Sequence, residues 1–265
     1  MYPELVGKVA VVTGAGRRGG LGAAMAMRLA AEGARVVVAD LGASDEMHSV
    51  VADITAAGGQ ALALPCDMLD ADAVEALFAR TVETLGGVDI LVNNAGIGDL
   101  MKPILDMSAS EWDTVLGVNL RGVFLATQAA AKRMVAAGRG GRIVNIASQA
   151  AKSGFPHAAA YCASKHGLVG LTRVAAIEFA PHAITVNAIC PNHVTTGLGA
   201  WQNEYFAKLL GKSVDQYLAD MKARIPLGRP GLPSDTASAC AFLCSDQAQY
   251  ITGEAMNVSG GEEVH

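Results

Sequence analysis

The amino-acid sequence predicts a doubly wound α/β fold, in which helices cover both faces of a parallel sheet. Short segments rich in Val, Ile and Ala recur along the chain, and longer segments with helical periodicity separate them. The short segments are apolar at nearly every position, as expected of strands that are buried on both faces. Because strand and helix alternate, we expect the strands to be parallel. The 265 residues suit one large domain, and no linker or repeat divides the chain.

We expect about seven strands, most of them followed by a helix. The first strand leads through a glycine-rich turn into the helical segment 21–33. The helix over 70–87 begins after the capping cluster "DMLD" and ends in two glycines. Two further helical segments span 111–128 and 158–180. The strand candidates are "KVAVVT" (8–13), "ARVVVAD" (34–40), "QALALPC" (60–66), "VDILVNN" (88–94), "GRIVNIAS" (141–148), "AITVNAIC" (183–190) and "EAMNVSG" (254–260).

The alternation breaks once, between Thr195 and Arg224, where the sequence has no strand signal. The segment "GLGAWQNEYFAKLLGKSVDQYLADMKARIP" has the pattern of one or two amphipathic helices with a turn at Gly211. It lies between the sixth and seventh strands, so it can cover the carboxyl edge of the sheet. We therefore expect a helical lid over about 195–225 within a single domain that spans 1–265.

The composition narrows the class of partners. The formal net charge is −5 and no dense basic run occurs, so nucleic acid is not an expected partner. No apolar run is long enough to span a membrane, and the N-terminal segment lacks the apolar core of a signal peptide. The five cysteines form no CxxC pair, so we expect free thiols, no metal site and a reducing, cytoplasmic location. Hydrophobic residues make up 51% of the chain, which favours a homo-oligomer, and we expect a tetramer.

The turn "VVTGAGRRGGLG" has the features of a phosphate-binding loop. It ends a strand and opens a helix, whose free N–H groups and dipole favour a pyrophosphate. Two alignments compete. Gly14, Gly16 and Gly19 match GxGxxG literally, whereas the start of the helical pattern places Gly20 and Gly22 at the helix N-terminus. We prefer the second alignment, in which Gly14 makes the tight turn and the two arginines form a bulge.

Together with later motifs, this turn resembles that of the short-chain dehydrogenase/reductase family, whose members have a Rossmann-type fold. The family fingerprint TGxxxGxG appears as "TGAGRRGGLG", with two residues inserted. The resemblance spans the chain from Lys8 to about Gly261 and implies hydride transfer with a nicotinamide cofactor. Further landmarks occur in family order, namely "CDM" (66–68), "NNAG" (93–96), Asn119, Ser148, "YCASK" (161–165) and "PNHVTT" (191–196).

Asp40 indicates one cofactor, and the two consecutive arginines, Arg17 and Arg18, indicate another. A carboxylate at the end of the second strand can accept hydrogen bonds from the adenosine ribose hydroxyls of NAD. It would repel the 2′-phosphate of NADP by about 4 kcal/mol if the charges lay roughly 4 Å apart. The arginines would offset this repulsion only if one of them reached the same corner. We therefore predict NAD as the cofactor, with NADP as the alternative.

The resemblance implies the remaining cofactor contacts. Asp67 would meet the adenine amine beside the Met68 backbone, although an aspartate there also suits a turn. Thr196 and the Val194 backbone would bond the nicotinamide amide. The predicted cofactor residues are Gly14, Arg18, Gly20, Leu21, Gly22, Asp40, Asp67, Met68, Asn94, Ala95, Gly96, Tyr161, Lys165, Pro191, Val194 and Thr196.

Tyr161 and Lys165 are four residues apart, so on a helix they share one face. A free tyrosine has a pKa near 10, and a nearby ammonium together with an oxidised nicotinamide would favour the phenolate. Tyr161 could then take the proton of an alcohol as hydride leaves, or return it in reduction. Ser148 would hold the substrate oxygen. The resemblance adds Asn119, a poor residue for a helix interior, on a proton path that includes the lysine.

The substrate side of the cleft is predicted from position. The family usually has glycine where this chain has Asn192. The expected substrate-binding groups offer hydrogen bonds without a cluster of cations, which favours a small polyol or sugar-like secondary alcohol. The alternatives are an NADP-dependent 3-oxoacyl or other carbonyl reductase, and a non-enzymatic cofactor-binding protein. The predicted substrate residues are Ser148, Gln149, His157, Asn192 and His193, with Phe155, Trp201, Gln202 and Tyr205 close by.

Overall fold

The computed structural model describes residues 1–265 and contains one sheet of seven parallel strands in the order β3-β2-β1-β4-β5-β6-β7. The predicted fold class is confirmed. Each strand lies within its predicted segment, except that β6 ends one residue later. The strands are β1 (Val9–Thr13), β2 (Arg35–Asp40), β3 (Gln60–Pro65), β4 (Ile90–Asn93), β5 (Gly141–Ile146), β6 (Ile184–Pro191) and β7 (Ala255–Val258).

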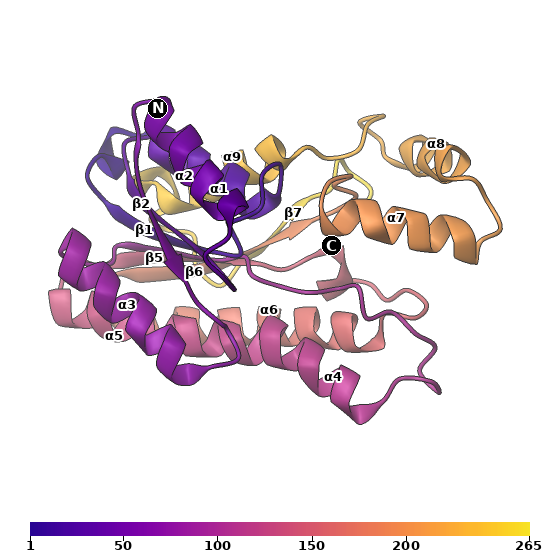
Figure 1. The fold of residues 1–265 in the computed structure, drawn as a ribbon, viewed down its shortest axis with the longest axis horizontal. Coiled ribbons are helices and arrows are strands. Elements are labelled where there is room, and N and C mark those ends of the chain that lie inside the picture. The colour runs from indigo at the N-terminus through magenta and orange to yellow at the C-terminus, as the bar shows by residue number, and fades with distance from the viewer.

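Helices cover both faces of this sheet. They are α1 (Leu21–Ala31), α2 (Asp45–Ala56), α3 (Ala71–Leu85), α4 (Ala109–Leu116), α5 (Val123–Ala137), α6 (Ala159–Phe179), α7 (Leu198–Leu209), α8 (Val214–Arg224) and α9 (Pro233–Cys244). Figure 1 shows α1, α2 and α9 above the sheet and α3, α5 and α6 below it. No helix combines the length and apolar character that a membrane crossing needs.

The core forms two layers because successive residues of a strand point to opposite faces. On β1, Ala10 and Val12 pack with residues of α1 and α9, whereas Val11 packs with residues of α3 and α5. Val11 also lies opposite Val37 of β2 and Leu91 of β4. From β1 the chain adds β2 and β3 on one side of the sheet, and then β4 to β7 on the other side. Because the direction reverses between β1 and β4, a crevice opens at the carboxyl ends of these two strands. Doubly wound sheets bind their ligands in that crevice.

The helical run predicted over 111–128 is not one continuous α-helix. Helix α4 ends at Leu116, α5 begins at Val123, and Gly117–Gly122 between them forms a wider π-helical turn. Such turns insert a residue into a helix and are frequent at functional sites. Asn119 lies in this turn, which explains how a residue with poor helix propensity is accommodated.

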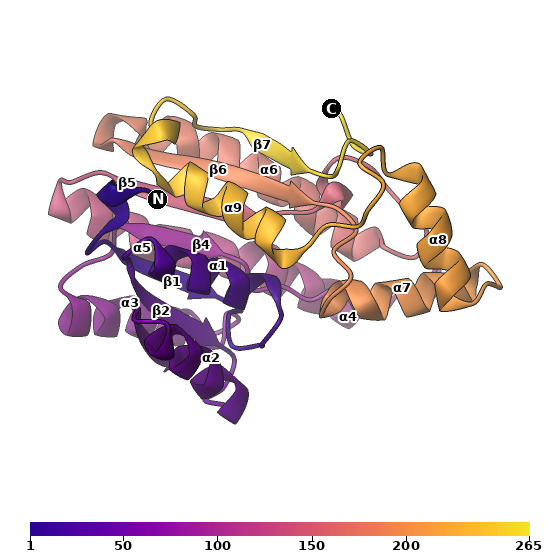
Figure 2. The same cartoon turned by 90° about the horizontal axis from the view of Figure 1, so that it is seen from above.

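Helices α7 and α8 project beyond the carboxyl edge of the sheet, where Figure 2 shows them apart from the helices that cover the two faces. The chain turns between them at Gly211, whose φ of 65° favours glycine. Ser213 then caps α8 together with Gln216. Phe206 of α7 packs on a buried cluster that includes Tyr217 of α8. The segment predicted as a lid is thus a helical hairpin.

Candidate active site

One large cavity, of about 870 Å³, opens at the carboxyl edge of the sheet. Its wall combines the glycine turn, the ends of several strands, the start of α6, both helices of the hairpin and the C-terminal tail. Every predicted cofactor residue except Arg18 lines it. The predicted substrate residues Ser148, Gln149, Asn192 and His193 line it as well, whereas His157 does not.

The backbone packs closely in the glycine turn, and the N-terminus of α1 stays open to the cavity. A Cβ atom at Gly22 would lie 2.3 Å from the Gly14 carbonyl oxygen, and one at Gly14 would lie 2.6 Å from the Ala95 Cα. Gly20 is the N-cap residue of α1 and has no side chain to cap the first N–H groups of the helix. Asn94 Nδ2 donates to the Gly14 carbonyl at 2.8 Å and fixes the turn. This cradle fits the pyrophosphate of a dinucleotide.

The structure separates the carboxylate and the two arginines that compete in the sequence. Asp40 lines the cavity, and its oxygens accept hydrogen bonds from the backbone N–H groups of Gly16 at 2.7 Å and Leu41 at 2.8 Å. Arg17 also lines the cavity. The guanidinium of Arg18 instead pairs with Asp53 of α2, its Nε donating at 2.7 Å, and so lies outside the cavity wall. The placement of Arg18 therefore differs from its predicted role, because α2 offers it a carboxylate at the surface.

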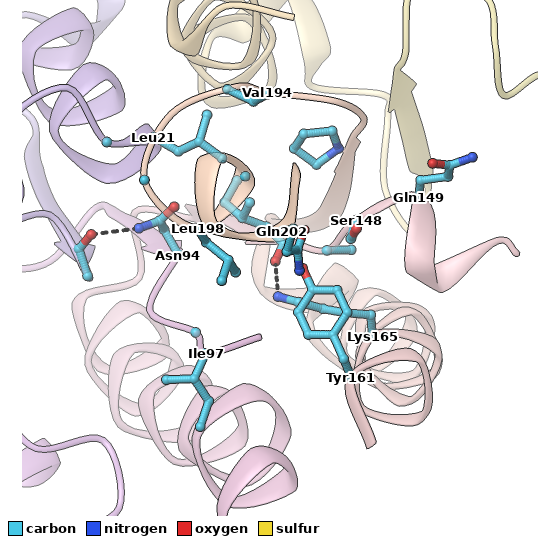
Figure 3. A pocket seen from close by; sticks show the side chains of 18 of the residues that line it. Leu21, Asn94, Ile97, Ser148, Gln149, Tyr161, Lys165, Val194, Leu198 and Gln202 are labelled. Carbon is cyan, nitrogen blue, oxygen red and sulfur yellow. Dashed lines mark hydrogen bonds between the residues drawn. The ribbon is translucent and has the colours of Figure 1, made fainter. Parts of the chain in front are cut away.

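Tyr161, Lys165 and Ser148 lie together in the cavity, and Figure 3 shows Gln202 and Leu198 of α7 facing them. Lys165 Nζ donates to the Ile146 carbonyl at 2.8 Å and lies 5.7 Å from the centre of the Tyr161 ring. Both side chains are buried.

Burial acts on the two pKa values in opposite directions. It raises the pKa of Tyr161, with the neighbouring Ser148 hydroxyl opposing the rise, and it lowers the pKa of Lys165 to about 8. Desolvation disfavours the charged form of each group. The chain alone therefore does not favour the phenolate that the sequence analysis expected. That expectation also relied on the positive charge of an oxidised nicotinamide, which would have to outweigh the effect of burial.

Asn119 lies behind the cavity wall rather than in it. Its Oδ1 accepts from the Ile97 N–H at 2.8 Å, and its Nδ2 donates to the Ile97 carbonyl at 2.8 Å and to Ser164 Oγ at 3.2 Å. The side chain is fully buried. Asn119 thus fastens the segment after β4 to the helix that carries Tyr161 and Lys165.

Three aromatic or imidazole side chains expected near the substrate instead hold α7 against the loop before α6. His157 Nδ1 lies 2.7 Å from the Tyr205 hydroxyl, and the Tyr205 ring stacks on Trp201 with centres 5.3 Å apart. None of these three residues lines the cavity, whereas Phe155 and Gln202 do. The contacts attach α7 to the loop before α6. Asp67, although in the wall, also accepts from the Leu69 N–H at 2.8 Å, as a turn residue does.

Sequence reasoning missed one part of the wall, where the hairpin and the C-terminal tail meet. A strand that ends at the carboxyl edge delivers the following residues to the same edge, and this signal could have identified the acidic residues after β7. For the segment predicted as a lid, only Trp201, Gln202 and Tyr205 are expected at the cleft. The missed residues are Asn203, Phe206, Leu209, Leu210, Tyr217, Arg224 and Glu262.

A glycine cradle at a helix N-terminus that shares a cavity with Ser148, Tyr161 and Lys165 defines the class of dinucleotide-binding oxidoreductases. Comparison with known proteins agrees. Residues 14–263 match the family model described as enoyl-(acyl carrier protein) reductase. The chain belongs to the short-chain dehydrogenase/reductase family.

Relatives with different named activities are similar to nearly the whole chain. It is 39% identical to 2-dehydro-3-deoxy-D-gluconate 5-dehydrogenase of Escherichia coli, over 97% of this chain and 96% of that protein. It is 38% identical to L-2,3-butanediol dehydrogenase of Corynebacterium glutamicum, over 96% of this chain and 98% of that protein. Among solved structures, actinorhodin polyketide ketoreductase with NADPH matches with a TM-score of 0.93 and 38% identity, and each chain is fully covered.

Proposed function

We propose that this oxidoreductase transfers a hydride between NAD(H) and a small secondary alcohol or its ketone, with a polyol or sugar-like alcohol as substrate. The observation that carries the cofactor assignment is the Asp40 carboxylate in the cavity wall at the end of β2. Two backbone N–H groups hold this carboxylate in place. A fixed carboxylate there suits the ribose hydroxyls of NAD and opposes a 2′-phosphate.

The three side chains in the cavity support the reaction type. NAD, when bound, accepts the hydride from the alcohol carbon. Ser148 holds the alcohol oxygen by a hydrogen bond beside Tyr161. Tyr161 takes the hydroxyl proton as the C–H bond breaks, and returns it when a ketone is reduced. Lys165, held by the Ile146 carbonyl, supplies positive charge beneath the phenol.

The lining of the cavity supports a small hydroxylated substrate. Gln149 and Asn192 offer amide donors and acceptors, whereas Phe206 and Leu198 of α7 provide apolar contact. A site built from such donors and acceptors rejects analogues that lack the matching hydroxyls, because its own polar groups are then left unpaired. The similarity to a butanediol dehydrogenase is consistent with this substrate class.

A second candidate is an NADP-dependent carbonyl reductase, and one observation favours it. Arg17 lines the cavity near the glycine turn and makes no ion pair. An arginine in this turn suits a 2′-phosphate. The similarity to a ketoreductase with NADPH points in the same direction.

Titration with NADH and NADPH, followed by a screen of alcohols and carbonyls, distinguishes the two candidates. We expect NADH to bind at least about ten times more tightly, a difference of about 1.4 kcal/mol. Asp40→Asn should reduce or abolish this ratio because it removes the repelling charge. The matched control is Asp45→Asn, an exposed residue outside the cavity wall, which should leave the ratio unchanged.

Equal affinities in the wild type, or a ratio that Asp40→Asn does not alter, would contradict the assignment of NAD. Tyr161→Phe serves as the control for turnover, since it removes only the titrating hydroxyl. A clear preference for a 3-oxoacyl thioester over polyols would favour the reductase.

A further inference from the structure

The part of the cavity wall that the sequence analysis missed contains a hydrogen-bonded cluster around Glu262. Its Oε2 accepts from Asn192 Nδ2 at 2.9 Å and lies 2.9 Å from His193 Nε2. Its Oε1 accepts from Arg224 Nε at 3.1 Å. The cluster therefore joins the loop after β6, the end of α8 and the C-terminal tail. All four side chains line the cavity.

The charges within the cluster nearly cancel. Glu262 carries a negative charge and Arg224 a positive one, and they form an ion pair. Burial and the nearby Arg224 lower the pKa of His193, although Glu262 opposes them, so the imidazole is neutral at neutral pH. A nearly neutral cluster attracts neither an anionic nor a cationic group strongly. It suits a neutral ligand that can both donate and accept hydrogen bonds.

Several polar groups beside the cluster have no protein partner. When His193 donates from Nε2 to Glu262, its Nδ1 is an acceptor, and no side chain or backbone group donates to it. Tyr217 lines the cavity, and burial raises the pKa of its hydroxyl, with the nearby Arg224 opposing the rise. This hydroxyl makes no hydrogen bond within the protein. The Asn203 amide, on a residue that is only 8% exposed, lines the cavity without a partner. Polar groups in such places gain most from a ligand that bonds to them.

We propose that Glu262, Arg224, His193 and Tyr217 form a second substrate subsite, which binds a hydroxyl-bearing, uncharged end of the substrate away from the reacting carbon. Glu262 is its specificity-determining residue. The remaining acceptor capacity of its carboxylate takes a substrate hydroxyl, and the neighbouring donors fix its position. This inference rests on the proposed function, because it specifies the substrate class of the same cavity.

The competing occupant is a carboxylate end, which Arg224 could bind and which the similarity to a deoxygluconate dehydrogenase brings into consideration. Glu262 opposes it, because an anion that approached Arg224 would meet the Glu262 carboxylate already paired there. Removing that charge should therefore change the preference of the subsite between neutral and anionic substrates.

The test compares matched compounds of equal chain length: sorbitol, hexan-2-ol and gluconate, with xylitol, pentan-2-ol and xylonate as a shorter set. Binding to the enzyme–NADH complex is measured by calorimetry or saturation-transfer NMR, and turnover is measured separately. The variants are Glu262→Gln and Tyr217→Phe. The matched control is Glu263→Gln, the same change at the next residue, whose carboxylate pairs with His265 and does not line the cavity.

We expect Glu262→Gln to weaken binding of the polyol about tenfold, to leave the mono-alcohol within a few-fold, and to strengthen binding of the carboxylate. Tyr217→Phe should weaken only the polyol, by a smaller factor, and Glu263→Gln should change none of the three. If the wild type binds the polyol no better than the mono-alcohol, or if Glu262→Gln weakens both equally, the subsite does not exist. If the wild type prefers the carboxylate, Arg224 binds an anion and the proposal is wrong. Polyol binding that depends on Glu262 without any reduction of NAD would overturn the proposed function and leave the subsite standing.

Discussion

Lys165 is the residue at which burial and chemistry conflict most directly. The proposed function places its ammonium beside Tyr161, yet burial lowers the pKa of Lys165 to about 8. The Ile146 carbonyl at 2.8 Å compensates the ammonium only in part. The folded protein therefore holds a charge at neutral pH that its surroundings disfavour, and this buried charge reduces stability.

This conflict predicts a particular pH dependence of stability. Because the folded pKa lies below the ordinary value of 10.5, the unfolded chain binds more protons between about pH 8 and 10.5. The contribution of Lys165 to stability is therefore unfavourable below about pH 8 and improves as the pH rises through that window. The free energy of unfolding of the wild type, relative to Lys165→Met, should increase over this range in urea denaturation without cofactor.

A solvent-exposed lysine provides the control for this experiment. Lys132→Met on α5 is exposed and should give a flat difference from the wild type over the same range. A flat difference for Lys165→Met as well would show that burial does not depress the lysine pKa in solution.

The residues of the site differ in how far the sequence predicts them. The sequence predicts that Tyr161 and Lys165 lie together, because the helical period alone places them on one face. The sequence does not predict the ion pair between Arg18 and Asp53, because this pair depends on the direction in which the two-residue bulge points. Glu262 is missed because a short tail has no periodicity, and only its position after the last strand at the carboxyl edge indicates a role.

At the scale of elements, the glycine turn is attached to α2 by its own bulge. The Arg18 N–H donates to Glu46 and its guanidinium pairs with Asp53, so one residue of the bulge is bound to the neighbouring helix. The adjacent Arg17 is left in the cavity wall. The sequence predicts the turn between the first strand and α1, but its contact with α2 depends on how these elements lie relative to one another in the fold.

This division of roles predicts different effects for the two arginines. Arg18→Ala should leave the affinities for NADH and NADPH within a few-fold, because its side chain lies outside the cavity. Arg17→Ala should weaken NADPH specifically, since only a 2′-phosphate gains from a cation there. Fluorescence titration of both cofactors with both variants measures these effects. A loss of NADPH affinity in Arg18→Ala that exceeds the loss in Arg17→Ala would reverse the assignment.

The π-helical turn between α4 and α5 shows a limit of the same kind. Periodicity predicts a helix through Asn119 but cannot show that the helix widens there. The wider turn lets the Asn119 amide reach both the N–H and the carbonyl of Ile97, which lies in the loop after β4. The need for Asn119 to bridge these segments becomes visible only when β4 and α6 are placed around the turn.

For the molecule as a whole, the apolar composition leaves large apolar side chains exposed at several places on the surface, and α6 carries two of them. On α6, Val174 is 54% exposed and Ile177 is 76% exposed, three residues apart on one face. Tyr250 is fully exposed. Three residues later the chain lies against α6, since a Cβ atom added at Gly253 would lie 3.5 Å from the Ala176 Cβ. Large apolar residues exposed side by side on one helix face are typical of surfaces that associate with other chains.

We therefore expect the protein to form a homo-oligomer, a tetramer by the sequence analysis, with this face of α6 in a contact between copies. A closed assembly repeats each contact, so a charge at one buried position disrupts every copy of it. Ile177→Glu should lower the molar mass in size-exclusion chromatography with light scattering. Val82→Glu places the same charge on a partly exposed position of α3 and serves as the control. A wild type with the mass of one chain, or an Ile177→Glu variant with the wild-type mass, would show that this face is simply solvated.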